Sequence, residues 1–200
     1  MVKKITFLLI LVVTLQGYSQ NKFPERFTTL IDFEFNDIVS DTTKGLPDGR
    51  YYTKKQLPDG TVAFIKTIAY KNNKKHGEAL TFMKGLGIMF LANVTNYCKG
   101  KKDGYYFETD NHTYSKQGYY KKDKKHGYWE ISENDTHENI NYKNGLKSGA
   151  YSSEDNLSGI HIKGQYKKDK KDGVWIIKDT TIEEVTKEVY KNGKLISSED

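Results

Sequence analysis

The sequence has only one cysteine, Cys98, among its 200 residues. An intramolecular disulfide is therefore excluded, even in an oxidising compartment. Cys98 directly follows Tyr97, at a position where similar segments have lysine. We interpret it as a small residue at the end of a strand, and the alternative is a dimer formed through a Cys98 disulfide. A nucleophilic role is not expected, because the sequence places no base beside it.

Long apolar runs are also scarce. One run occupies residues 5–15, after Lys3 and Lys4 and before a stretch of small residues. This pattern is typical of a secretory signal peptide, which we expect to span residues 1–19 and to be cleaved near Ser19/Gln20. The alternative is an uncleaved membrane anchor. Because no later run is long enough to cross a bilayer, we expect no transmembrane span and an exported protein, periplasmic or extracellular.

The chain lacks a strong excess of one charge. It has 32 lysines and arginines against 26 acidic residues, which gives a net charge of +6 and a pI of about 9.0. Without the two leader lysines, the mature net charge is +4. The carboxylates are interspersed with the lysines, and export is expected. We therefore predict no nucleic-acid partner.

Clusters of residues suited to a metal, a cofactor or catalysis are missing too. None of the five histidines is paired with cysteine or with another histidine at zinc-type spacing; they are His76, His112, His126, His137 and His161. The glycines form no phosphate-binding loop. Carboxylates are abundant, but nothing selects two that would face each other across a cleft. We expect no enzyme activity, no catalytic residue, no metal site and no cofactor.

What the sequence does contain is a recurring frame in which a tyrosine precedes a glycine by seven residues. Residues 120–127 read Y-K-K-D-K-K-H-G, and residues 166–173 read Y-K-K-D-K-K-D-G. The frames start and end at Tyr70 and Gly77, Tyr97 and Gly104, Tyr120 and Gly127, Tyr142 and Gly149, and Tyr166 and Gly173, with a worn copy from Tyr190. Successive tyrosines are 27, 23, 22, 24 and 24 residues apart, which indicates a repeat architecture.

Each frame is interpreted as a tight turn between two antiparallel strands. Its centre holds Asn-Gly in the frames from Tyr142 and Tyr190 and Lys-Asp in those from Tyr120 and Tyr166, and asparagine, aspartate and glycine tolerate the positive φ that short hairpins require. Two residues after the frame glycine comes a large ring in four copies, at Tyr106, Trp129, Tyr151 and Trp175. Side chains alternate along a strand, so each of these rings shares a sheet face with its frame glycine. A glycine beside a ring, such as Gly164, lets the ring lie flat over the backbone.

The frames resemble the MORN repeat, particularly its bacterial variant form. The matching segments are residues 120–129, 142–151 and 166–175 and, less well, 97–106 and 70–77, with residues 47–51 as a further copy at the front. The resemblance implies an all-β fold, a single-layer elongated sheet of antiparallel hairpins, with about six hairpin repeats in residues 46–200. It implies no single function, because such repeats serve in different proteins as membrane-associating, protein-docking or scaffold modules, and some bacterial variants are labelled antitoxin-like.

Two segments fall outside this pattern. Residues 20–45 contain several phenylalanines and are expected to form a short helix or strand that caps the first repeat or links to it, because a terminal hairpin leaves an apolar face uncovered. Residues 84–94 are the most hydrophobic part of the mature chain. We interpret them as a buried central strand, with a partner-facing insertion as the alternative.

These observations predict an exported, non-enzymatic binding or scaffold module at the cell envelope, with a protein or glycan partner. The alternatives are an antitoxin-like or immunity-type partner protein and an envelope hydrolase. In the middle copies, Tyr105, Phe107, Tyr119 and Tyr128 alternate away from the frame rings. They form our predicted binding patch, together with the surrounding Lys121, Lys122, Lys124 and Lys125, because aromatic residues dominate binding hot spots. The alternative is that the phenylalanines of residues 21–45 cover this patch.

Overall fold

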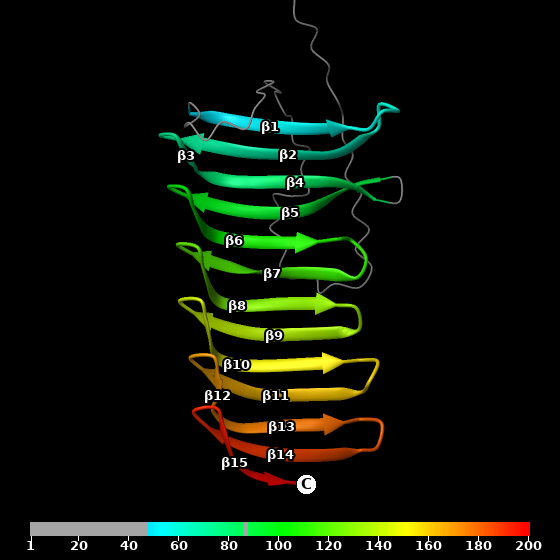
Figure 1. Cartoon of the computed structure of the whole chain (residues 1–200), viewed down its shortest axis with the longest axis vertical. Coiled ribbons are helices and arrows are strands. Elements are labelled where there is room, and N and C mark those ends of the chain that lie inside the picture. The colour runs from blue at the N-terminus through cyan, green and yellow to red at the C-terminus, as the bar shows by residue number, and fades with distance from the viewer. Residues whose placement is uncertain (1–47, 86–87) are drawn as a thin grey trace, which may run out of the picture.

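A computed structural model describes residues 48–85 and 88–200, and these residues form one open antiparallel sheet without a helix. The strands follow one another in space in chain order, so the sheet grows as a ladder of hairpins (Figure 1). The predicted all-β, single-layer, elongated sheet is confirmed. The predicted signal peptide and N-terminal cap lie outside the described residues. No described segment forms a helix capable of spanning a membrane.

The strands are β1 (Gly49–Gln56), β2 (Val62–Lys71), β3 (Lys74–Lys75), β4 (Gly77–Gly85), β5 (Ile88–Cys98), β6 (Lys101–Thr109), β7 (Tyr114–Lys121), β8 (Lys124–Glu133), β9 (Thr136–Lys143), β10 (Leu146–Asp155), β11 (Ile160–Lys167), β12 (Lys170–Lys171), β13 (Gly173–Asp179), β14 (Glu184–Lys191) and β15 (Lys194–Glu199). The short strands β3 and β12 pair with β2 and β11 and lie off the main path. Each frame tyrosine lies near the end of a strand, and its frame turn leads into the next one.

The six frame turns lie along one side of the sheet, at the left in Figure 1. In every one, two consecutive central residues have positive φ, as at Asn144 (55°) and Gly145 (89°). This is the conformation expected of two-residue hairpin turns, so the predicted tight turns are confirmed. The five frame glycines also have positive φ, between 69° and 111°, where a residue with a side chain would be strained.

Residues 84–94 are divided between two strands. Lys84 and Gly85 end β4, and Ile88 begins β5, which runs between β4 and β6 in the interior of the sheet. Ala92 and Val94 are buried. The prediction of a central strand therefore holds for residues 88–94, but its burial is confined to Ala92 and Val94, because Ile88 is 64% exposed and the other residues are half-buried.

Both faces of the sheet carry apolar clusters. We call the face with Tyr106, Trp129, Tyr151 and Trp175 the ring face; its cluster centres on Tyr106, Trp129 and Ile140. The opposite face has a cluster of Leu80, Phe82 and Val94 near the N-terminal end of the sheet. Trp129 and Trp175 are 0% and 1% exposed, although the described strands form a single layer.

Candidate binding surface

The ring face is filled by two equivalent aromatic units. In the first, Trp129 lies 5.1 Å from Tyr120 in an edge-on arrangement and 5.7 Å from Tyr106 in a tilted one, measured between ring centroids. In the second, Trp175 lies 5.0 Å from Tyr166 and 5.4 Å from Tyr151 with nearly the same angles. Edge-on and offset contacts of this kind are favourable for aromatic rings. The frame and ring residues of the sequence analysis are thus brought together as packing.

A glycine lies beneath each tryptophan. A Cβ atom built on Gly118 would come within 2.3 Å of the Trp129 ring, and one built on Gly164 within 2.3 Å of the Trp175 ring. No other residue fits these positions without displacing the indole. The Trp129 Nε1 also donates a hydrogen bond to the Tyr119 carbonyl at 3.1 Å. The flat packing of a ring over glycine backbone predicted at Gly164 is confirmed, and Gly118, which was not predicted, shows the same packing.

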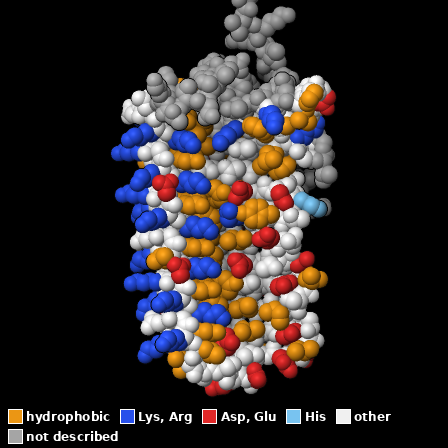
Figure 2. Space-filling view, viewed as in Figure 1, with side chains coloured by type: hydrophobic (Ala, Val, Ile, Leu, Met, Phe, Trp, Pro, Cys, Tyr) orange, Lys and Arg blue, Asp and Glu red, His pale blue; other side chains and the backbone are white. Residues whose placement is uncertain are grey.

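The ring face also holds a column of lysines that the sequence analysis did not identify. Lys125 Nζ lies 4.7 Å from the centroid of Tyr142, the tyrosine of the following frame, and 4.5 Å from that of Trp129. Four other lysines contact the tyrosine of the following frame in the same way, with Nζ 4.5–5.3 Å from the ring centroid: Lys75, Lys102, Lys147 and Lys171. Such cation–π contacts are favourable. The column is visible inside the ring face in Figure 2.

The sequence did carry a signal for this column. The fifth residue after the frame tyrosine is lysine in five frames and leucine, Leu195, in the sixth. The predicted role of Lys125 as part of the rim of the binding patch is therefore wrong, because its ammonium group lies on the ring face. Burial lowers the pKa of Lys125, as expected for a cation held among rings.

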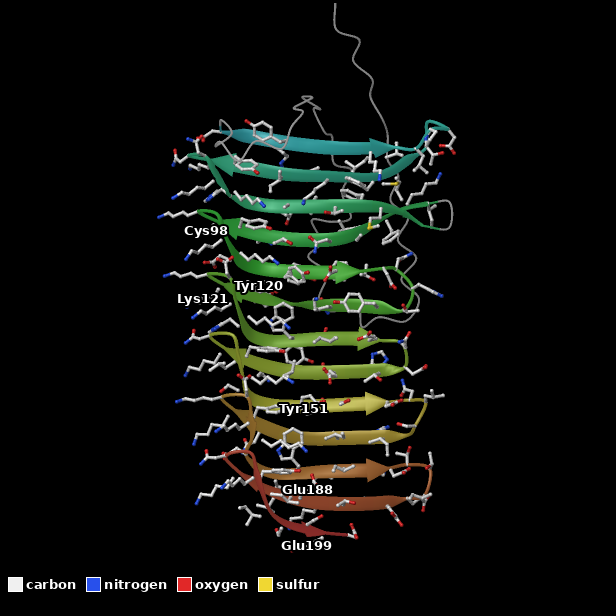
Figure 3. All side chains as sticks on the ribbon, in the orientation of Figure 1. Cys98, Tyr120, Lys121, Tyr151, Glu188 and Glu199 are labelled. Atoms are coloured by element: carbon white, nitrogen blue, oxygen red, sulfur yellow. The ribbon has the colours of Figure 1, made fainter. Side chains whose placement is uncertain are left out.

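Glutamates accept hydrogen bonds from three tyrosine hydroxyls of the ring face. The Tyr106 hydroxyl donates to Glu108 at 2.8 Å, the Tyr151 hydroxyl to Glu138 at 2.9 Å, and the Tyr190 hydroxyl to Glu188 at 2.9 Å. Figure 3 shows Tyr120, Tyr151 and Glu188 on this face, and Cys98 and Lys121 on the side with the frame turns. On the ring face, the aromatic rings, lysines and glutamates therefore contact one another.

The predicted binding patch lies on the opposite face, on the neighbouring strands β6, β7 and β8. Tyr105 is directly opposite Tyr119 in the β6–β7 register, with ring centroids 5.7 Å apart. The patch has two halves. Tyr119 and Tyr128 are 55% and 40% exposed, whereas Tyr105 and Phe107 are half-buried against the cluster of Leu80, Phe82 and Val94.

Hydrogen bonds fix the hydroxyl groups of the patch. The Tyr105 hydroxyl donates to Gln117 Oε1 at 2.9 Å, and Gln117 in turn donates to Glu130. The Tyr128 hydroxyl donates to Asn139, whose amide donates to Ser152 Oγ at 3.3 Å. Burial raises the pKa of Tyr105 to about 12, so this phenol stays neutral and keeps its proton for Gln117. The rings are therefore held in place on strands, beside amide and carboxylate groups.

The cysteine and the histidines are the remaining candidate residues of the sequence analysis. Cys98 is the last residue of β5, is exposed and has a free thiol. Among the described residues, no group of histidine, cysteine and carboxylate side chains is arranged to hold a metal ion. His126 follows its turn within β8, half-buried, and no Nδ1 partner is found for it among the described residues.

No known family model matches this chain, and no curated protein matches it.

Proposed function

We propose that this chain is a MORN-like repeat protein that is exported to the cell envelope and acts there as a non-enzymatic binding or scaffold module. Its partner is an envelope protein or glycan, and it docks on the patch of Tyr105, Phe107, Tyr119 and Tyr128. The single observation that carries the proposal is the exposure of Tyr119 and Tyr128. The frame rings of the middle copies are buried or half-buried on the ring face, whereas these two are presented to solvent.

The surroundings of the two rings support binding. Both lie on interior strands of the sheet. Tyr119 is paired with Tyr105 on one side and His126 on the other. Tyr128 is paired with Asn141 beside an irregularity in the β7–β8 register. Tyr119 rests against Tyr105, and Tyr128 is fixed through Asn139. Little side-chain entropy remains to be lost when a partner covers such rings, which favours affinity. The neighbouring amides of Gln117 and Asn139 supply the hydrogen-bonding groups that a protein backbone or a sugar hydroxyl requires.

The test is capture of partners from envelope extract by the immobilised protein and by a Tyr119→Ala, Tyr128→Ala variant. Tyr119 and Tyr128 are chosen because they are the exposed half of the patch. We expect the partner to be captured by the wild-type protein and lost from the variant, with little change in melting temperature. The control is Leu195→Ala with Ile196→Ala, which removes two exposed apolar side chains from β15 (51% and 62% exposed).

Two results would contradict the proposal. A large fall in the melting temperature of the tyrosine variant would mean that the patch is part of the core. Equal capture by wild type, variant and control would mean that the partner binds elsewhere.

A further inference from the structure

The side of the sheet formed by the frame turns carries a row of exposed lysines. We call it the lysine row; it continues along the whole height of the sheet at the left of Figure 2. Its members are all exposed and lie in or beside the six turns: Lys71, Lys74, Lys99, Lys101, Lys121, Lys122, Lys124, Lys143, Lys167, Lys168, Lys170, Lys191 and Lys194. The turns on the other side of the sheet instead hold Asp59, Asp110, Asp155 and Asp179.

The charges of the lysine row are not neutralised within the described part of the chain. The ion pairs found there involve Lys116, Lys171 and Lys187, none of which belongs to the row. The frames contain four aspartates, and three of them accept hydrogen bonds from the backbone of a neighbouring turn. Asp123 accepts from the Lys102 amide at 2.8 Å, Asp169 from the Lys147 amide at 2.6 Å, and Asp172 from the Asn192 amide at 3.2 Å. These carboxylates hold turns together instead of pairing with the lysines.

The spacing of the row is fixed by contacts between successive turns. The fourth residue of each later frame donates its amide hydrogen to the carbonyl of the sixth residue of the frame before, at 2.8–2.9 Å. The donors are Gly100, Asp123, Gly145, Asp169 and Gly193, and the acceptors are Lys75, Lys102, Lys125, Lys147 and Lys171. Frames recur every second strand, so the turns are about 9.5 Å apart and the row is about 48 Å long.

We propose that the lysine row binds a linear acidic polysaccharide, a polyuronate, that runs along the stacked turns. A straight row of fixed positive charges matches an extended polymer with regularly repeated carboxylates. The turn spacing is close to the length of a disaccharide unit in an extended chain. The row shares Lys121, Lys122 and Lys124 with the predicted surroundings of the aromatic patch, but this proposal does not depend on the function proposed for the patch.

The chemistry of the turn tips favours a polyuronate over a nucleic acid. Frame positions two to five contain lysine, asparagine, aspartate, glycine, one cysteine and one leucine, but no aromatic residue. Single-stranded nucleic acids are bound by aromatic side chains on which the bases stack, and such rings are missing from this row.

The experiment measures binding of the full protein to polygalacturonate by titration at several salt concentrations. The row variant is Lys121→Gln, Lys122→Asn, Lys167→Gln and Lys168→Asn. Asparagine is used at residues 122 and 168 because both have φ of 50°, which asparagine tolerates well. The control variant removes the same charge from exposed lysines outside the frame turns: Lys66→Gln, Lys84→Gln, Lys163→Gln and Lys178→Gln.

We expect wild-type binding to weaken steeply with salt, because each contact releases counterions from the polymer. The row variant should bind at least about tenfold more weakly, since four exposed ion contacts of modest strength are lost together. The control variant and the Tyr119→Ala, Tyr128→Ala variant should bind within about twofold of wild type, as changes outside the site usually have little effect.

Several outcomes would overturn the proposal. Equal weakening of the row and control variants would show that only net charge matters. Tighter binding to a DNA duplex, or to vesicles of anionic lipid, than to polygalacturonate would identify a different class of partner. Salt-dependent self-association that the row variant abolishes, without polygalacturonate binding, would mean that the row meets the acidic side of a second copy.

Discussion

A single layer of strands can bury a tryptophan completely when neighbouring side chains close over it. Trp129 lies on Gly118, is bordered by Tyr106, Tyr120 and Tyr142, and is covered by the stem and ammonium group of Lys125. Tyr120 and Tyr142 are both frame tyrosines, whereas Gly118, Tyr106 and Lys125 come from other positions of the frames or their flanking strands. The core is therefore built from side chains that meet across strands, and the described residues contribute no second sheet or helix to cover them.

At Trp129, we expect alanine to lower the free energy of unfolding by about 3–5 kcal/mol, because a fully buried ring is removed and a cavity remains. Lys124→Ala in the adjoining turn is the comparison and should have almost no effect, as is usual for surface changes. Denaturant unfolding followed by circular dichroism measures both. Equal effects from the two substitutions would refute the assignment of faces.

Gly118→Ala tests the close approach of the indole to the backbone. A methyl group at this position would enter the Trp129 ring, and overpacking of this kind costs about 1–3 kcal/mol. The cost should largely disappear in a Trp129→Ala background, because the methyl group then has room. A double-mutant cycle of unfolding free energies measures this coupling. Additive effects would mean that Gly118 is needed for another reason.

Among the elements, the frame turn has the strictest requirements. Lys99, Lys122 and Lys168 occupy its first central position with φ of 50–51°, although lysine is not favoured there. Asparagine fills the same position at residues 72, 144 and 192. The backbone hydrogen bonds between successive turns hold the lysines in this conformation. The lysines therefore present exposed charges from a strained backbone position.

Asp123 shows how one turn depends on the next. Asp123→Ala should cost about 2 kcal/mol, because it removes the acceptor for the Lys102 amide and places alanine at φ 67°. Asp123→Asn keeps both the acceptor and the tolerance of positive φ, so its cost should be below about 0.5 kcal/mol. Unfolding free energies and hydrogen exchange of the Lys102 amide give the answer. A similar loss for both variants would show that the carboxylate charge is what matters.

The sequence predicted the elements better than the contacts between them. Tyrosine, turn and glycine recur in register, so the hairpins and the face of Trp129 and Trp175 could be derived from alternation and turn chemistry. The position of Lys125 could not be derived in this way, because its charge suggested solvent while its contacts lie on the neighbouring frame. The available signal was the recurrence of lysine five residues after the frame tyrosine. Partial burial of Tyr105 and Phe107 depends on Leu80, Phe82 and Val94, which lie in earlier strands outside the local pattern.

At the scale of the whole molecule, the two sides of the sheet at which the strands turn carry opposite charges. Frame turns place lysines on one side, and the other turns place aspartates on the opposite side. Hydrogen bonds from the Thr61, His112 and Ser158 amides lower the pKa values of Asp59, Asp110 and Asp155, so these aspartates remain charged well into acid. Tyrosines occupy both faces between the two charged sides.

The tyrosines give the molecule a specific sensitivity to alkaline pH. Burial raises the pKa values of Tyr105 and Tyr151 to about 12, from an ordinary value of 10, and it also raises the pKa values of Tyr120, Tyr142 and Tyr166. A group whose pKa is raised by folding stabilises the fold below its unfolded pKa, and this stabilisation is lost as pH rises through the folded pKa. We therefore expect stability to be retained up to about pH 10 and to fall between about pH 10 and 12.

Tyrosinate absorbance and circular dichroism, followed together during an alkaline titration, check this expectation. Ionisation of the buried phenols should coincide with loss of the strand signal, because a charged phenolate cannot remain among the rings. The same titration in denaturant is the control and should show phenols that ionise near pH 10. If the phenols of the folded protein also ionise near pH 10 while the strand signal persists, the packing of the tyrosines described for the two faces is wrong.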